Sequence, residues 1–427
     1  RAAGQRYYVM MRPQEHEMAL PARLFRWRGF ADGPEVLVFR IAGSYGTWGD
    51  ITEGHLRQAA SDLPDGVAHA MAFYGVGDHG GGPTARMIEW LRDHREAFPG
   101  LWLEFSSPAR FFAAVADQLA HAPLVTGELQ YHAVGCYSVE RGLKTRLRRA
   151  EHLLRQAELT DPDAPGLEAA WRHVAFNHFH DILGGTSVPG AYPALYDQLG
   201  AAAARADGLL QRDLRRRLPA LPADPHQRIV LRNASDLPFD GYVEHEPWLG
   251  WGWHTDLHLR DEDGAVIPAQ IMQSEAANRQ TITRLLFPIT LAPGELRAIR
   301  IVREAVEMPS RARATMARLT AEGGAAFTDD GMQVAQQLLS LPRLDLIDDD
   351  TDNWSHGVDR FPDGPVTSPA WNAPMPVDAG PLMASLLQTG RIGDSTLRAE
   401  WRVYADRPFV ELRLRVHWRA VKTVLKL

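Results

Sequence analysis

The hydrophobic pattern of this 427-residue chain changes its period at a proline-rich stretch, residues 218–228. Before this stretch, apolar residues recur at helical spacing, and the clearest stripe consists of Leu143, Leu147, Ala150 and Leu154. After it, apolar and polar residues alternate, as in residues 410–418, which is the pattern of a half-buried strand. The chain is therefore expected to fold into helical and β parts that a linker joins.

The first 120 residues alternate strand and helix patterns. Short apolar runs bounded by turn residues predict strands at 35–41, 67–74 and 101–105. Helical spacing predicts a helix at 83–98 and another over Phe111, Phe112, Val115 and Leu119. This β-α-β-α order is typical of a mostly parallel sheet covered by helices.

The rest of the chain predicts two further domains. Residues 138–217 contain three helical patterns with short connections, which favour a three-helix bundle. Residues 257–267 predict a hairpin around Asp263 and Gly264, and the period of two throughout this region favours an antiparallel β-sandwich. The predicted fold class is thus multidomain, with these parts: a partial parallel α/β domain at 1–120, a bundle at 121–217, the linker at 218–228, and a β-sandwich region at 229–427. We expect both ends to be cut from a longer polypeptide, with the sandwich truncated at its end.

The composition limits the partners that the chain can have. Hydrophobic residues make up 45% and charged residues 23%, which is ordinary for a globular protein. The net charge of -7 argues against a nucleic-acid partner. No apolar run reaches the ~20 residues of a membrane span, so we expect no membrane partner. The single cysteine, Cys136, fits a reducing compartment, and we expect a cytoplasmic location. A homo-oligomer is compatible with this composition.

A helix predicted at residues 165–183 carries the first candidate site. Paired glycines, Gly184 and Gly185, are expected to end it. On a helical wheel one arc holds polar groups, namely His173, Asn177, His180 and Asp181. Because most of the remaining circumference is apolar, the helix is expected to be buried, and buried imidazole and carboxylate groups must be paired or bind a metal or ligand. Satisfied core polar groups and the site of a different metallohydrolase are the alternatives.

The second candidate site is a glycine-rich loop at residues 75–84, which follows the strand predicted at 67–74. Active sites in parallel sheets gather at the carboxyl ends of strands, so Asp78 and His79 are candidates for catalysis. A flexible turn that only caps the following helix is the alternative. Tyr45, after the preceding strand, could stack on a sugar or pack the turn.

A third candidate lies in the β region, in an acidic and aromatic loop at residues 348–361. Its side chains Trp354 and His356 could face a ligand. A loop that bridges domains, or an ordinary surface loop, would have the same composition.

Taken together in chain order, these stretches resemble the α-mannosidases of glycoside hydrolase family 38. The resemblance spans nearly the whole chain and rests on co-linear motifs at residues 25–37, 77–84, 127–151, 177–185 and 354–361. It implies a retaining, exo-acting α-mannosidase that hydrolyses terminal α-linked mannose in oligosaccharides.

The resemblance also assigns roles to individual residues. His180 matches a zinc ligand, and Asp181 matches the neighbouring carboxylate that holds sugar hydroxyls. Asp78 matches the family's acid loop, in which His79 stands where many members have glycine, so either residue is a candidate proton donor. Tyr45, Trp354 and His356 are then candidates for contact with substrate. The implied cofactor is zinc.

The sequence departs from the family by an absence. The His-x-Asp pair near the family's N-terminus and the segment of the aspartate nucleophile have no match in this chain. A retaining glycosidase needs two carboxyl groups ~5 Å apart, and this chain supplies at most one of them. We therefore expect the chain to be an incomplete portion that is inactive alone, with the other zinc ligands outside it. A non-catalytic carbohydrate-binding or scaffold protein with a β-sandwich is the alternative from another class.

Overall fold

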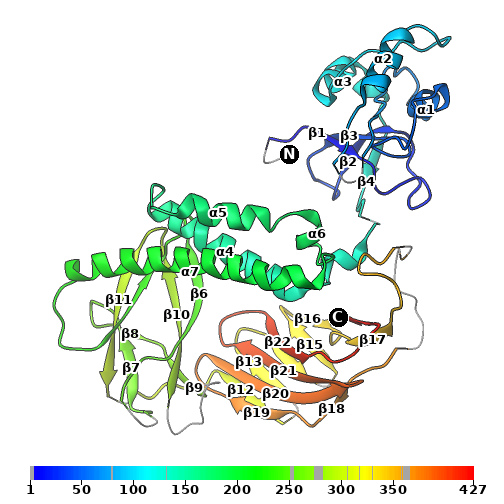
Figure 1. Cartoon of the computed structure of the whole chain (residues 1–427). Helices are drawn as coiled ribbons and strands as arrows, with labels where there is room; N and C mark the ends of the chain where they lie inside the picture. The colour runs from blue at the N-terminus through cyan, green and yellow to red at the C-terminus, as the bar shows by residue number, and fades with distance from the viewer. Residues whose placement is uncertain are drawn as a thin grey trace. The chain divides into compact units, whose positions relative to one another are not determined.

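The computed structural model describes residues 4–77, 80–130, 132–250, 254–273, 282–304, 306–316, 318–328, 330–356, 358 and 366–427. The chain divides into two compact units. The first consists of Arg1–Gly135 with Trp354–Arg360, and the second of Cys136–Asn353 with Phe361–Leu427. Each is described by itself below, and Figure 1 colours them along the chain. The domain boundaries expected from the sequence stay predictions.

The first unit contains a four-stranded sheet in the order β1-β3-β2-β4 and three α-helices among its described residues. The strands are β1 Tyr7–Met10, β2 Leu24–Arg28, β3 Val36–Arg40 and β4 Leu124–Thr126. The helices are α1 Glu53–Ala59, α2 Ala85–Asp93 and α3 Pro108–Ala114, followed by a 3-10 turn at Ala116–His121. Phe39 of β3 packs against Phe111 of α3, while Val38 faces the opposite side of the sheet.

This sheet is mixed: two of its three described strand pairs are parallel, as the sequence predicted, and the central pair is antiparallel. β1 pairs with β3 and β2 with β4 in parallel, but β2 and β3 are antiparallel. The strands predicted at 67–74 and 101–105 are absent from the structure, which describes both segments in full. Leu101 and Leu103 pack against the cluster that contains Met87 of α2. The apolar run there therefore indicates side-chain packing, although its backbone pairs with no described strand.

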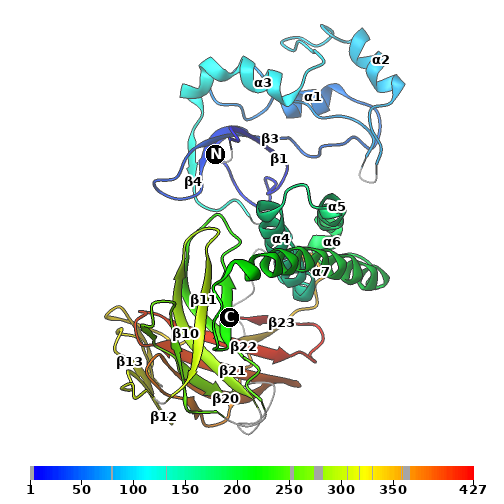
Figure 2. The ribbon, with the colours of Figure 1, turned by 90° about the vertical axis from the view of Figure 1, so that its left-hand side faces the viewer.

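The second unit begins with four helices: α4 Arg141–Thr160, α5 Leu167–Phe176, the short α6 His180–Leu183, and α7 Tyr192–Arg217. Helices α4, α5 and α7 lie side by side in Figures 1 and 2 and share one apolar core. The stripe expected on α4 is buried, as predicted, at Leu143, Leu147, Ala150 and Leu154. It packs against a matching stripe on α7 that includes Leu195, Leu199 and Ala202.

All strand pairs described in the second unit are antiparallel, as the alternating pattern predicted. One pair of sheets shares the core that contains Leu259, Phe287 and Ile299. Its strands are β5 Arg228–Arg232, β6 Phe239–His245, β7 Leu257–Arg260, β8 Val266–Ile267, β9 Gln270–Gln273, β10 Thr283–Leu291 and β11 Leu296–Arg303. Their orders are β5-β11-β7-β8 and β6-β10-β9. The predicted hairpin is confirmed as β7 and β8.

A second pair of sheets follows, so the β region contains two layered cores where one was expected. Leu319, Phe327 and Trp401 lie in its core. The first of these sheets consists of β12 Ala312–Thr315, β13 Arg318–Ala321, β14 Ala326–Thr328, β15 Gly331–Val334 and β16 Gln337–Leu339. The other consists of β18 Ala370–Trp371, β19 Met375–Asp378, β20 Met383–Ile392, β21 Ser395–Tyr404 and β22 Val410–His417. Strands β17 Asp345–Asp348 and β23 Thr423–Lys426 pair with each other.

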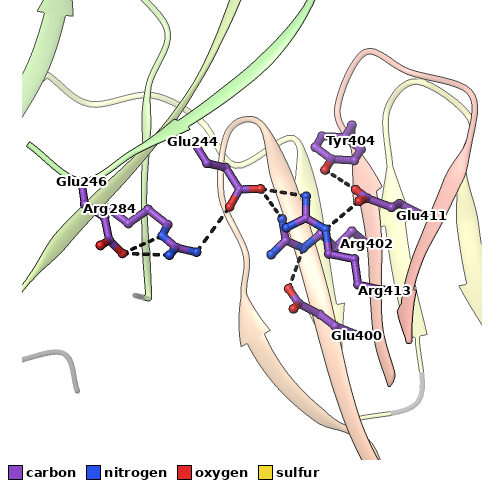
Figure 3. A network of polar contacts seen from close by, with 8 residues as sticks. All are labelled: Glu244, Glu246, Arg284, Glu400, Arg402, Tyr404, Glu411 and Arg413. Atoms are coloured by element: carbon purple, nitrogen blue, oxygen red, sulfur yellow. Dashed lines mark hydrogen bonds and ion pairs between the residues drawn. The ribbon is translucent and has the colours of Figure 1, made fainter. Parts of the chain in front are cut away.

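The two pairs of sheets are joined by a network of charged side chains centred on Glu244 of β6 (Figure 3). The Glu244 carboxylate accepts hydrogen bonds from Arg402, at 2.7 Å, and Arg413, at 2.8 Å. Arg402 is only 2% exposed and also donates to Glu400. Because an unpaired buried guanidinium would be costly, this network fixes β6 against β21 and β22.

Candidate functional site

The segment that carries His180 is not the single buried helix that the sequence predicted. Helix α5 ends at Phe176, and Asn177 is its C-cap. The buried Asn177 side chain donates to the carbonyl of His173, at 2.7 Å, and to Gln198 Oε1 of α7, at 2.9 Å. An asparagine side chain that bonds to nearby backbone competes with helix continuation, so the chain turns and starts the separate α6.

The predicted burial of the site is also wrong. The His180 side chain is 74% exposed and that of Asp181 44%. Two aromatic residues beside them, Phe176 and Phe179, are 61% and 51% exposed. The wheel failed because α5 buries only one face, that of Leu167, Ala170 and Val174, and because the break at Asn177 changes the direction of every residue after it. An imidazole and a carboxylate thus lie next to each other at the surface of the second unit, with His180 Nε2 3.7 Å from Asp181 Oδ1.

The polypeptide after α6 is held tightly by two glycines. A Cβ atom at Gly184 would lie 2.8 Å from the His180 carbonyl oxygen. Gly185 has a φ of +79°, and a Cβ there would lie 2.7 Å from the Val139 carbonyl oxygen. A side chain at Gly184 would therefore disturb the last turn of α6, and one at Gly185 would push the chain away from the 139 segment, where only glycine fits both the space and the positive φ.

Lys144 of α4 is a positioning residue to which the sequence analysis assigned no role. Its ammonium donates to the carbonyls of Leu183, at 2.9 Å, and Val139, at 2.5 Å. Burial lowers the pKa of Lys144 and raises that of the neighbouring Cys136. A lysine directly beside the apolar stripe of α4 was the available signal, because such a residue needs acceptors near its ammonium.

The glycine-rich loop lies in the first unit. Asp78 and His79 are outside the described residues, so their catalytic assignment stays a prediction. The flanking backbone is described, and Val76 pairs with Gly82 across the loop. Two hydrogen bonds join this loop to the loop that follows β3. Thr47 N donates to the Gly75 carbonyl at 2.8 Å, and Gly75 N donates to Thr47 Oγ1 at 3.3 Å.

The loop attached through Thr47 carries exposed aromatic side chains. Tyr45 is 46% exposed, which leaves both its stacking and its packing role open. Trp48, three residues later, is 81% exposed. Trp48 lies outside the sequence motifs, although a tryptophan in a glycine-rich loop is a signal for an exposed ring. Two aromatic rings thus flank the attachment point of the glycine-rich loop.

Trp354 and His356 also belong to the first unit, where their rings stack at 6.1 Å. The Trp354 carbonyl accepts from Gly135 N at 3.2 Å, and the His356 ring lies 5.8 Å from that of His132. His132 in turn contacts Glu17, at 2.6 Å. Trp354 and His356, which are more than 200 residues away in sequence, are thus held in the first unit by Gly135 and His132. This arrangement fits the bridging alternative for the loop, and a role in substrate binding stays a prediction.

Of the expected zinc centre, the described residues include one pair of possible ligands. His180 and Asp181 carry an imidazole nitrogen and a carboxylate oxygen, which are donor types that zinc takes. Across the parts of the chain that the structure describes, no group of three or more histidine, cysteine, aspartate or glutamate residues could hold a metal ion. The described residues therefore fit part of a zinc site. The convergence of His180 and Asp181 with residues of the first unit stays a prediction.

Comparisons with known proteins place these features in context. Residues 130–216 match the model of the alpha mannosidase middle domain, a range that contains α4, α5, α6 and all of α7 except its last residue, Arg217. Over 187 residues the chain is 32% identical to Alpha-mannosidase 2C1 of Homo sapiens, covering 40% of this chain and 18% of that protein. Over 183 residues it is 31% identical to Alpha-mannosidase G of Dictyostelium discoideum, covering 40% and 17%. The match thus covers less than a fifth of these relatives' length.

Solved structures extend the likeness of fold to the whole chain. An alpha-mannosidase from Enterococcus faecalis V583 superposes with a TM-score of 0.64 at 15% identity, covering 98% of this chain and 58% of the solved one. A protein in glycosyl hydrolase family 38 from Enterococcus faecalis gives a TM-score of 0.61, also at 15% identity, covering 96% and 58%. At this identity the superposition speaks for the fold alone.

The middle-domain segment resembles that of α-mannosidases, and the mixed α/β fold with several antiparallel sheets resembles that of a solved alpha-mannosidase, which is the architecture of a multidomain glycoside hydrolase. More narrowly, the chain is similar to α-mannosidases in its middle-domain segment and, in fold, to a protein in glycosyl hydrolase family 38. The family resemblance found in the sequence is confirmed. No helix within the described ranges combines the length and apolarity that a membrane crossing requires.

Proposed function

We propose that this chain is part of a retaining exo-α-mannosidase that removes terminal α-linked mannose from oligosaccharides. The observation that carries the proposal is the exposed pair of His180 and Asp181 on α6, inside the segment that matches the α-mannosidase middle domain. A pure binding module or scaffold would have no need of an imidazole and a carboxylate held in this way by Lys144, Asn177 and two glycines.

In this proposal His180 offers a nitrogen ligand to zinc, and Asp181 binds hydroxyl groups of the terminal mannose. Bound zinc would supply a Lewis acid for adjacent sugar hydroxyls. The further ligands would come from residues outside the motifs of this chain. The exposure of both side chains supports these roles, because the imidazole nitrogen must be accessible to a metal ion and the carboxylate to sugar hydroxyl groups.

The proton donor would come from the glycine-rich loop, through Asp78 or His79. Departure of the leaving group requires a proton, and a retaining enzyme needs a second carboxylate ~5 Å from the acid as nucleophile. We assign that nucleophile to a residue outside this chain. Tyr45, Trp48, Trp354 and His356 are proposed as substrate contacts, since aromatic rings stack on the apolar faces of sugars.

The finer organisation and setting belong to the same proposal. Residues 1–120 would form the C-terminal part of a catalytic α/β domain, 121–217 the bundle, and 229–427 the β-sandwich region. We also propose a cytoplasmic location, which the single cysteine supports.

The test is hydrolysis of aryl α-mannosides. We expect activity from the polypeptide of the full reading frame and none from the 427-residue chain. His180→Ala and Asp181→Asn should each abolish most activity, whereas His178→Ala, two residues from the pair, should retain it. An inactive full-length polypeptide, or full activity of His180→Ala, would contradict the proposal.

A further inference from the structure

A groove in the second unit is lined by residues from the end of α4, the segment before α5 and the C-terminal half of α7. Its volume is about 240 Å³, far larger than a single water requires. It is lined by Ala157, Thr160, Asp161, Pro165, Arg205, Leu209, Arg212 and Arg216. The α7 residues recur at a spacing of four, three and four, so three arginines lie on one face of that helix.

The charges of this groove are poorly compensated by the protein. Within the described part of the chain Arg212 has no ion pair, and Arg216 has only Asp213, at 3.8 Å. Asp213 is itself bound more closely by Arg217, at 2.8 Å, and by Arg232. Asp161 is the single acid on the lining, against three guanidinium groups. The groove therefore carries a net positive charge open to a ligand.

Arg205 is held at the base of the groove. One of its terminal nitrogens donates to the Pro165 carbonyl, while its Nε is shielded from solvent and has no hydrogen-bond partner. The guanidinium lies over Gly166, where a Cβ would come within 3.0 Å of Nε. The Pro165 bond and the packing over Gly166 thus fix the position of this guanidinium on the groove lining.

The backbone next to Arg205 favours an anion as well. Gly166 is the N-cap of α5, a helix of 10 residues, and no side chain caps its first N–H groups. The helix dipole there favours negative charge, although the Leu167 N–H already donates to the Ala164 carbonyl and the first turn already carries Glu168. The dipole at the end of α7 explains Arg215 to Arg217 as a stabilised C-terminus, but it does not reach Arg205, about three turns earlier.

We propose that this groove binds a phosphate group, either as free phosphate or as the phosphate of a small sugar ester. Guanidinium groups bind tetrahedral oxyanions through paired N–H donors, and Arg205, Arg212 and Arg216 surround the groove with such donors. The site is separate from the His180 and Asp181 pair and does not depend on mannosidase activity.

Titration calorimetry on the 427-residue chain tests the proposal at constant ionic strength, with inorganic phosphate, a hexose monophosphate and the unphosphorylated hexose as probes. We expect both phosphate probes to bind and the neutral hexose not to bind. Arg212→Gln should weaken phosphate binding about tenfold or more, since a hydrogen bond to a charged group is lost. Tighter binding of the ester would identify a sugar phosphate as the ligand, and equal binding would identify free phosphate.

The matched control is Arg149→Gln, which removes the same charge from an exposed position of α4 without a partner among the described residues. It should leave phosphate affinity within about twofold. Melting temperatures in chloride show that both variants fold. Absence of phosphate binding, equal weakening by both variants, or equal binding of the neutral hexose would overturn the proposal.

Discussion

The longest and the shortest α-helices described in the second unit are held in place by different forces. Helix α7, Tyr192–Arg217, is held by an apolar stripe that packs against α4 and α5. Helix α6, His180–Leu183, buries only Ile182 and is held by hydrogen bonds from Lys144 and by the turn at Asn177. Apolar packing thus maintains the unit, while polar contacts position the candidate zinc ligand His180 and the candidate substrate contact Asp181 within it.

The largest effect on stability should therefore come from the α7 stripe. Leu199 is 1% exposed, and Leu199→Ala should lower the free energy of unfolding by about 4 kcal/mol through lost burial and a residual cavity. Urea unfolding of the second unit measures this. Leu159→Ala removes the same atoms from a site that is 38% exposed and should cost less than about 0.5 kcal/mol. Equal losses in the two variants would break the comparison.

The network around Glu244 extends the contrast to the β sheets and adds a dependence on pH. Burial alone would raise the pKa of Glu244, but Arg402 and Arg413 outweigh burial, and the pKa lies below its usual range. The stabilisation is therefore present at neutral pH and is lost as the pH falls below about 4.3 through the lower folded pKa. Glu244→Gln should cost about 3 kcal/mol near neutral pH.

The measurement is the urea midpoint of wild type and variant across the acid range, where the gap between them should close as the pH falls. Glu168→Gln is the control, because Glu168 forms an exposed ion pair with Arg172. Its midpoint should not change measurably. A constant gap for Glu244→Gln would show that charge does not hold these sheets together.

Lys144→Met should have a smaller effect on stability, about 2 kcal/mol, because it leaves the Val139 and Leu183 carbonyls without their donor. If polar contacts position α6, the same variant should reduce α-mannosidase activity of the full-length polypeptide much more than it reduces its folded fraction. Paired measurements of kcat and of the melting temperature test this, with Lys426→Met as the control at an exposed lysine. Unchanged kcat in Lys144→Met would show that α6 is positioned by other contacts.

Sequence patterns predicted the apolar parts of this fold better than the polar ones. The stripe on α4 and the hairpin at 257–267 follow from periodicity and turn residues, which act locally. The break at Asn177 could not be predicted in this way, because it depends on Gln198, a residue distant in sequence. The mixed sheet was missed for the same reason, since ladder partners are not encoded in a single run.

The candidate site was found through its residues and was misjudged in its surroundings. His180 and Asp181 are adjacent, as expected, but they are exposed because the helix wheel does not continue across the turn. Trp48 and Lys144 had no assigned role, since one lies outside the motifs and the other acts through two backbone carbonyls.

The most direct test of the central claim is the zinc content of the full-length polypeptide, measured by elemental mass spectrometry after exhaustive dialysis. We expect about one zinc ion per chain in the wild type and a near-complete loss in His180→Ala, with His178→Ala unchanged. Retention of zinc by His180→Ala would contradict the assignment of α6 as part of the metal centre.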